Sequence, residues 1–161
     1  MKIKFFAIAL AALSLIACEK EPEPIVPEQA DYVGTLTVEA TAGTVVNSEA
    51  RIDFLPFQDG TAELMLYEVK FSPKMPMKLD VLIPGITITS TPEKVILSGN
   101  EIVPLAMGGN QFPQYTVTDL KGEIIGDKLS FTLKLGGIPT SYIGEKCEAP
   151  APEKPETPAA Q

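Results

Sequence analysis

The residues that enzymes most often use for catalysis are scarce in this sequence of 161 residues. There is no histidine, which excludes Ser-His-Asp and Cys-His catalysis and removes the commonest ligand of zinc, copper and haem. There is also no Cys-x-x-Cys pair, no phosphate-cradling glycine loop and no calcium-loop spacing. Asp53 and Asp80 could act as general acids if buried, but they alternate with apolar neighbours, which favours the solvent face. We therefore expect no enzyme activity, no metal and no cofactor.

Cys18 is the residue with the clearest predicted chemistry. Lys2 and Lys4 precede an apolar run that ends in Leu15-Ile16-Ala17-Cys18, a pattern typical of an export signal. The run is too short for a spanning helix, which needs about 20 residues. Its end looks like a lipobox, which predicts that residues 1–17 are a lipoprotein signal peptide and that Cys18 carries lipid worth about 0.8 kcal/mol per buried CH₂. The alternative is an ordinary secretory signal followed by a structural cysteine.

The mature chain that this cleavage would leave is strongly acidic. The 13 basic residues, less Lys2 and Lys4, leave 11 against 21 acidic residues, a formal net charge of −10. Nucleic acid and anionic headgroups would be repelled, so we expect membrane contact through the lipid on Cys18. We expect an outer-membrane protein and a monomer, facing either the cell surface or the periplasm. Glu19-Lys20-Glu21 resembles a short surface-directing tag or is only a solvated tether, and Cys147 is either an idle thiol or an intermolecular disulfide partner.

Two segments rich in charge and proline flank the region that can fold. Residues 18–30 are acidic and proline-rich, which predicts an extended tether. Residues 147–161 are rich in proline, alanine and glutamate, which predicts a disordered tail. Between them, residues 31–146 suffice for one domain but not for two.

Alternation of apolar and polar residues predicts that this domain is all-β. In residues 128–135, for example, Phe131 and Leu133 face one way while Ser130 and Thr132 face the other. Asp-Gly at 59–60 and Gly-Asp at 126–127 predict hairpins, and Pro-Gly at 84–85 predicts a bulge or an edge. The expected strands are 32–40, 50–57, 61–71, 77–83 with 86–89, 95–97 paired with 102–107, 114–125, 128–135 and 138–143. This number of short strands predicts a sandwich or a barrel, and closure into a barrel removes exposed edges.

Three motifs together resemble a known family. They are Tyr32-x-Gly34-Thr35-Leu36-x-Val38, Ile96-Leu97-Ser98-Gly99 and Leu120-Lys121-Gly122-Glu123-Ile124-x-Gly126-Asp127-Lys128-Leu129. In this order they resemble the calycin-like β-barrel domains on lipoproteins of gut anaerobes, over most of residues 31–146. The resemblance implies a single antiparallel up-and-down barrel of about eight strands, shaped like lipocalins. There is no tryptophan, so the lipocalin Gly-x-Trp signature is absent and a lipocalin ligand cup is not implied.

Two predicted loops have the composition of a binding rim. Residues 72–76 and 107–113 place apolar side chains among prolines, glycines and amides, and loops on rigid scaffolds often carry function. We select Met75, Phe112 and Tyr115 as candidate rim or ligand contacts, although methionine and aromatic residues fill cores equally well. The leading hypothesis is a non-enzymatic barrel that binds a small apolar ligand, a glycan or a peptide. The alternatives are a structural or adhesive envelope protein with a packed barrel and a protein inhibitor of a hydrolase.

Overall fold

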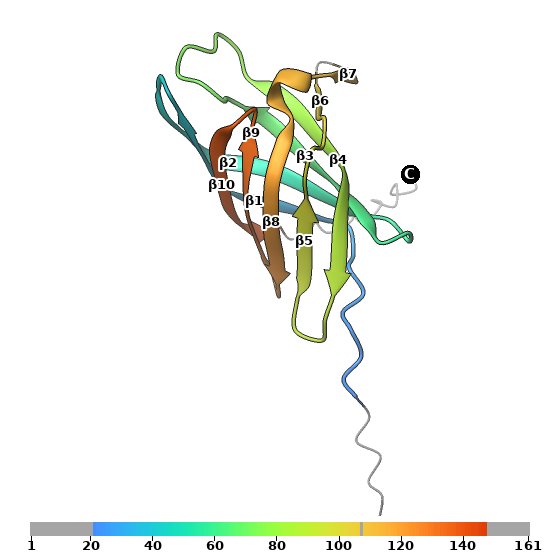
Figure 1. Ribbon diagram of the computed structural model, residues 1–161. Helices are drawn as coiled ribbons and strands as arrows, with labels where there is room; N and C mark the ends of the chain where they lie inside the picture. The colour runs from blue at the N-terminus through green and yellow to red at the C-terminus, as the bar shows by residue number, and fades with distance from the viewer. Residues whose placement is uncertain (1–20, 107, 148–161) are drawn as a thin grey trace, which may run out of the picture.

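The computed structural model describes residues 21–106 and 108–147. The predictions on Cys18, the signal peptide and the tail beyond Cys147 lie outside these residues, as does Met107. The described chain is almost entirely strand (Figure 1). The elements are β1 (Ala30–Ala40), β2 (Gly43–Pro56), β3 (Thr61–Val69), β4 (Leu79–Ser90), β5 (Val95–Gly99), β6 (Leu105–Ala106), β7 (Asn110–Gln111), the 3-10 turn η1 (Pro113–Tyr115), β8 (Val117–Ile125), β9 (Lys128–Leu135) and β10 (Ile138–Lys146).

Eight strands close into one antiparallel barrel, as the sequence predicts. Around the barrel the order is β3-β2-β1-β10-β9-β8-β5-β4, and β3 also pairs with β4 to complete the circle. Every pairing is antiparallel. Neighbours in the barrel are also neighbours among the eight barrel strands in the chain, and the last strand pairs with the first, so the barrel is an up-and-down meander. The short β6–β7 ribbon lies between β5 and β8 in the chain and attaches to β4.

The turns divide the barrel into two ends. The lower end holds the start of β1, the end of β10 and the β2–β3, β4–β5 and β8–β9 turns (Figure 1). The upper end holds the β1–β2 and β9–β10 turns, the 70–78 loop and the 100–116 excursion. Residues 21–29 leave the barrel at its lower end, on the side of the lower turns (Figure 1).

Some strand boundaries depart from the predicted ones. Strand β4 continues through Pro84 and Gly85, and a register shift lies opposite them, between Ala62 and Leu64; this is the predicted bulge. Strand β2 begins at Gly43 rather than at residue 50. The expected pairing of residues 95–97 with 102–107 is wrong, because β5 pairs with β4 and β8 while β6 pairs with β4 and β7.

The barrel interior is filled by its own side chains. Buried apolar residues from all eight barrel strands form one cluster, and the largest of them are essentially inaccessible to solvent. The rings of Phe131 and Tyr142 stack with centroids 5.2 Å apart, and the Tyr142 hydroxyl donates a hydrogen bond to the Ala50 carbonyl at 3.3 Å. The barrel strands therefore enclose a packed core of their own side chains.

Candidate functional site

The three predicted rim residues lie together at the upper end of the barrel. Phe112 and Tyr115 stack with ring centroids 6.1 Å apart, and Tyr115 lies 5.7 Å from the buried ring of Phe71. The sulfur of Met75 accepts a hydrogen bond from the Phe71 amide at 3.5 Å. Met75, Phe112 and Tyr115 are partly buried and pack against the core. These residues thus cover the upper end, and their role as ligand contacts stays a prediction.

The lower end is partly covered by the last residues of the tether. The Ile25 amide donates a hydrogen bond to the Thr91 carbonyl in the β4–β5 turn at 2.9 Å. Residues 25–28 line a hollow together with Tyr32, Phe54 and Val95, which are the lowest residues of the core. The last tether residues therefore run beneath the barrel with one backbone hydrogen bond to it, and most of their side chains stay exposed.

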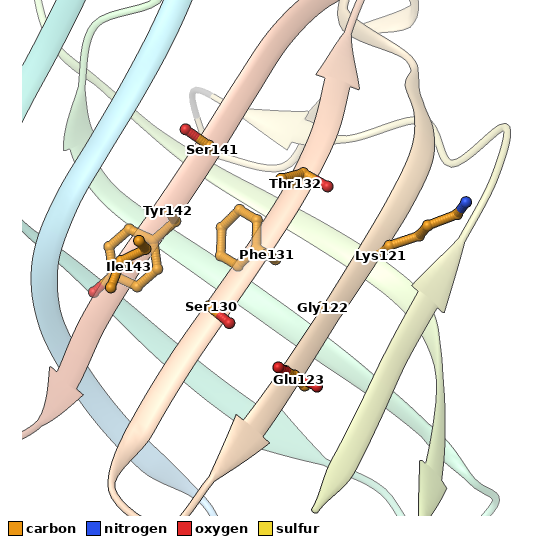
Figure 2. A pocket seen from close by; sticks show the side chains of 9 residues that line it. All are labelled: Lys121, Gly122, Glu123, Ser130, Phe131, Thr132, Ser141, Tyr142 and Ile143. Atoms are coloured by element: carbon orange, nitrogen blue, oxygen red, sulfur yellow. The ribbon is translucent and has the colours of Figure 1, made fainter.

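Two connected hollows lie on the outer wall over β1, β8, β9 and β10. One has a volume of about 370 Å³ (Figure 2), and the other has about 280 Å³. Both are lined by Thr132 and Ser141, so they form one surface, which we call the hydroxyl groove. Its hydroxyl-bearing lining residues with outward side chains are Thr37, Ser130, Thr132 and Ser141.

Strand register brings the groove residues together. Lys121 pairs with Thr132, Thr132 with Ser141, and Ser141 with Thr37. A second row runs from Glu123 through Ser130 to Ile143, whose side chain is largely exposed. Neighbouring strands lie about 4.8 Å apart, so each row is a line of short side chains at that spacing. Figure 2 shows the residues that line the first hollow, which come from adjacent strands; of these, Phe131 and Tyr142 belong to the buried core.

The groove hydroxyls are available to a ligand. None of the four hydroxyls is held by a hydrogen bond to another group of the described chain, and each can both donate and accept. Ion pairs stand at the edges: Lys94 with Glu123, and Lys134 with Asp119, each at 2.8 Å. The hydrogen bond from Lys134 lowers the pKa of Asp119 below its usual value. The hydroxyl-bearing part of the groove is therefore neutral and polar, while Lys121 and Glu39 add one charge of each sign to its lining.

A second candidate surface is an open edge of β2. Its lower half pairs with β3 from Ile52 to Pro56, whereas residues 43–47 pair with β1 and with no second strand of the described chain. The Asn47 side chain bridges the resulting gap, since its amide donates to the Lys70 carbonyl at 3.1 Å and its oxygen accepts from the Lys70 amide at 3.0 Å. A hollow of about 560 Å³ lies between residues 45–51 and Tyr67, Glu68, Lys70 and Lys78.

Asp53 lies in a polar cluster on the outer wall. Its side chain is buried under those of its neighbours. It accepts hydrogen bonds from the Tyr67 hydroxyl at 2.9 Å and from Nε of Arg51 at 3.0 Å. Arg51, the only arginine in the sequence, also binds Asp31 at 2.9 Å. The bond to Asp53 raises the pKa of Tyr67 above its usual value. These contacts join β1, β2 and β3 on the outer wall.

Two further kinds of site are absent from the described part of the chain. No group of three or more acidic or cysteine side chains there is placed to hold a metal ion. No helix of residues 21–106 or 108–147 is long and apolar enough to cross a membrane.

These features define a class: an all-β protein with a closed eight-stranded barrel, a filled interior and its hollows on the outside. The sequence matches no protein family and no curated protein. The fold is similar to a solved structure of a Bacteroides fragilis protein provisionally named an outer membrane protein, with a TM-score of 0.52 and 19% identity. The similar region covers 73% of this chain and 50% of that one, so the chain spans about half of that structure. This likeness shows the barrel fold, and membership of the calycin-like family stays a prediction.

Sequence reasoning found part of the hydroxyl groove and missed the rest. Alternation along residues 128–135 places Ser130 and Thr132 on the outer face, as observed. Their position beside Ser141 and Thr37 depends on the register of β10 and β1, which the pattern of a single strand does not contain. A search for hydroxyl residues on the polar faces of consecutive hairpin strands would have found all four.

Proposed function

We propose that this protein is a lipid-anchored, non-enzymatic protein of the outer membrane. The lipobox-like end of the signal sequence at Cys18 supports the anchor, and the name of the structural neighbour supports the compartment. Apolar side chains fill the interior and polar ones cover the wall, the reverse of a barrel that spans a bilayer. A covalent lipid is therefore the means of attachment that fits this domain.

The anchor is tested by replacing Cys18 with serine in cells. We expect Cys18→Ser to leave the membrane fraction, because the acidic mature chain is repelled by anionic headgroups and the proposed lipid is what holds it there. Cys147→Ser is the matched control, which should stay in the membrane fraction. Unchanged membrane association of Cys18→Ser would defeat the anchor, and protease treatment of intact cells would show which side of the membrane the domain faces.

The task we propose for the tethered barrel is to bind a glycan in the hydroxyl groove. The observation that carries this proposal is the row of unengaged hydroxyls from Thr132 through Ser141 to Thr37. Sugars present alternating donors and acceptors, which such hydroxyls can match without a charge requirement. The exposed Ile143 side chain gives the apolar surface on which one face of a sugar ring can rest. The filled interior favours this outer surface over an apolar ligand held inside.

Nuclear magnetic resonance titration with soluble neutral and acidic polysaccharides tests the glycan proposal. We expect a neutral polysaccharide to shift the amide signals of residues 130–132 and 141–143. A lost neutral hydrogen bond costs about 0.5–1.5 kcal/mol, so Thr132→Val with Ser141→Ala should weaken binding by roughly fivefold to more than a hundredfold. The matched control is Thr87→Val with Thr89→Val, on the exposed face of β4. An equal loss of affinity in the groove variant and in the β4 control variant would contradict the proposal, as would the absence of signal shifts with any polysaccharide.

A structural or adhesive role is the second candidate, and the open edge of β2 favours it. An unpaired strand edge can accept an extended segment of another protein as an additional strand. The hollow beside residues 45–51 gives space for such a segment, and Val46 is exposed there. Pulldown from solubilised envelopes with wild type, Val46→Asp and the control Val33→Asp would test this role. Loss of one defined partner with Val46→Asp alone supports it, and recovery of no partner, or equal recovery with both variants, counts against it.

A further inference from the structure

We propose that the lower end of the barrel rests on the lipid bilayer, with Val26, Phe57 and Ile125 in its headgroup region. This inference depends on the lipid proposed for Cys18 and adds an orientation for the barrel and a set of membrane-contacting residues. Three observations carry it: the length of chain that separates Cys18 from the barrel, the distribution of exposed apolar side chains and the charges around them.

The chain between Cys18 and the barrel is short. The first tether residue bonded to the barrel's turns is Ile25, whose amide donates to the Thr91 carbonyl. Seven peptide steps separate Cys18 from Ile25, and even a fully extended chain covers no more than about 25 Å over that stretch. Strand β1 alone has 11 residues, which corresponds to about 36 Å. A lipid on Cys18 therefore keeps the lower end near the bilayer and leaves the upper end far from it.

Apolar side chains gather at this end. Val26 is 80% exposed, Ile125 50% and Phe57 45%, and they come from three separate segments: the tether, the β8–β9 turn and the β2–β3 turn. Val26 and Phe57 line one hollow with Ile88, while Val26 also lines the hollow beside Ile124 and Gly126. Val26 therefore lies between the other two. Interfacial segments commonly bury such side chains about 5–10 Å into the boundary between headgroups and acyl chains.

The charges around these residues select the kind of lipid surface. The acidic residues at the lower end include Glu28, Asp59, Glu93 and Asp127, and its lysines are Lys94, Lys128 and Lys146. Lys94 is paired with Glu123 and Lys128 with Glu145, so acidic groups outnumber the lysines there. An anionic surface would be repelled by this end, so the surface that fits is a zwitterionic one. The apolar contact is small. Its proposed role is to orient the barrel on the membrane, while the lipid on Cys18 retains it there.

The absence of tryptophan from the sequence makes single tryptophan substitutions unambiguous reporters. The mature chain with Cys147→Ser is coupled through Cys18 to a maleimide phospholipid in phosphatidylcholine vesicles, with or without bromine on the acyl chains. We expect Phe57→Trp and Ile125→Trp to emit at shorter wavelength on vesicles than in solution and to be quenched by the brominated lipid. Met77→Trp, at an exposed position of the upper end, is the control and should show neither effect.

The outcomes separate this proposal from the anchor itself. Because the lipid is attached chemically, the result does not depend on whether cells acylate Cys18, which the Cys18→Ser experiment decides. Emission and quenching at residues 57 and 125 equal to those at residue 77 would overturn the orientation. The two lower-end positions belong to different turns, so misfolding of one variant, detected by its urea unfolding curve, leaves the other to decide. Vesicles of phosphatidylglycerol should give weaker quenching at both positions, and stronger quenching would also overturn the proposal.

Discussion

Tyr142 is a fully buried side chain that links three neighbouring strands of the barrel wall. It starts on β10, and its hydroxyl reaches the Ala50 carbonyl on β2 at 3.3 Å, across β1. Two glycines that face each other on β1 and β10, Gly34 and Gly144, make this possible. A Cβ on Gly144 would collide with the Tyr142 hydroxyl, and a Cβ on Gly34 would collide with the Ile143 carbonyl. The ring covers backbone that has no side chain of its own, a use of aromatic residues known from other sheets.

Burial of the Tyr142 phenol should make the barrel less stable as the pH rises into the alkaline range. Desolvation raises the pKa of its phenol well above the usual value of 10.0. A raised pKa in the folded state contributes stability that is complete below the unfolded pKa and is lost as pH rises toward the folded one. We therefore expect the free energy of unfolding to fall above pH 10, by up to about 1.4 kcal/mol per pH unit from this group.

Tyr142→Phe isolates that contribution. Urea unfolding at neutral pH should show a loss of about 0.5–1.5 kcal/mol, because the hydrogen bond to the Ala50 carbonyl is removed. Between pH 10 and 12 the free energy of unfolding of the variant should fall less steeply with pH than that of the wild type. The difference in slope should correspond to about one proton released on unfolding. Parallel curves for the two proteins over this range would show that the phenol ionises as freely in the barrel as in the unfolded chain.

The elements differ in how far sequence could predict them. Strand β9 alternates without a break, so its bounds and both of its faces were predicted. The upper half of β2 was missed, because Asn47, Ser48 and Glu49 are three polar residues in a row and Glu49 adopts a positive φ of 62°. Tertiary contacts, pairing with β1 and the Asn47 bridge to Lys70, make this segment a strand. The false pairing of residues 102–107 has the same origin, since a local turn signal cannot show that β8, later in the chain, occupies that side of β5.

The Asn47 bridge gives a prediction for the open edge of β2. Asn47→Ala removes the side-chain bonds to the Lys70 amide, the Lys70 carbonyl and the Leu36 carbonyl, and we expect a loss of about 1–3 kcal/mol in the free energy of unfolding. Native-state hydrogen exchange should report faster exchange of the Lys70 amide in the variant, because its acceptor is gone. Ser48→Ala, at the exposed neighbouring position, is the control and should leave that amide protected. A Lys70 amide that keeps its protection in Asn47→Ala would show that the edge is held by other contacts.

On the scale of the whole molecule, the packed interior leaves the outer surface as the place for the binding that we propose. Each barrel strand pairs with two neighbours over part of its length, the upper half of β2 pairs with β1 alone, and the core joins the wall strands into one cluster. Residues from the 70–78 loop and the 100–116 excursion cover one end, and the tether covers part of the other. The lower end, the hydroxyl groove and the open edge are three separate surfaces, so a barrel tethered by its lower end can bind a glycan or a partner on its wall.

Benzene binding tests whether the interior is filled as described. We expect saturating benzene to leave the thermal unfolding midpoint of the wild type unchanged, because a packed core has no space for it. Phe71→Ala removes a buried ring at the upper end, should cost about 3–5 kcal/mol and should leave an apolar cavity of the kind that binds benzene. Benzene should therefore raise the midpoint of this variant, since a ligand that binds only the folded state stabilises it. Phe57→Ala, which removes an exposed ring, should show no such shift, and a benzene-dependent rise in the wild type would mean that the barrel holds an open cavity.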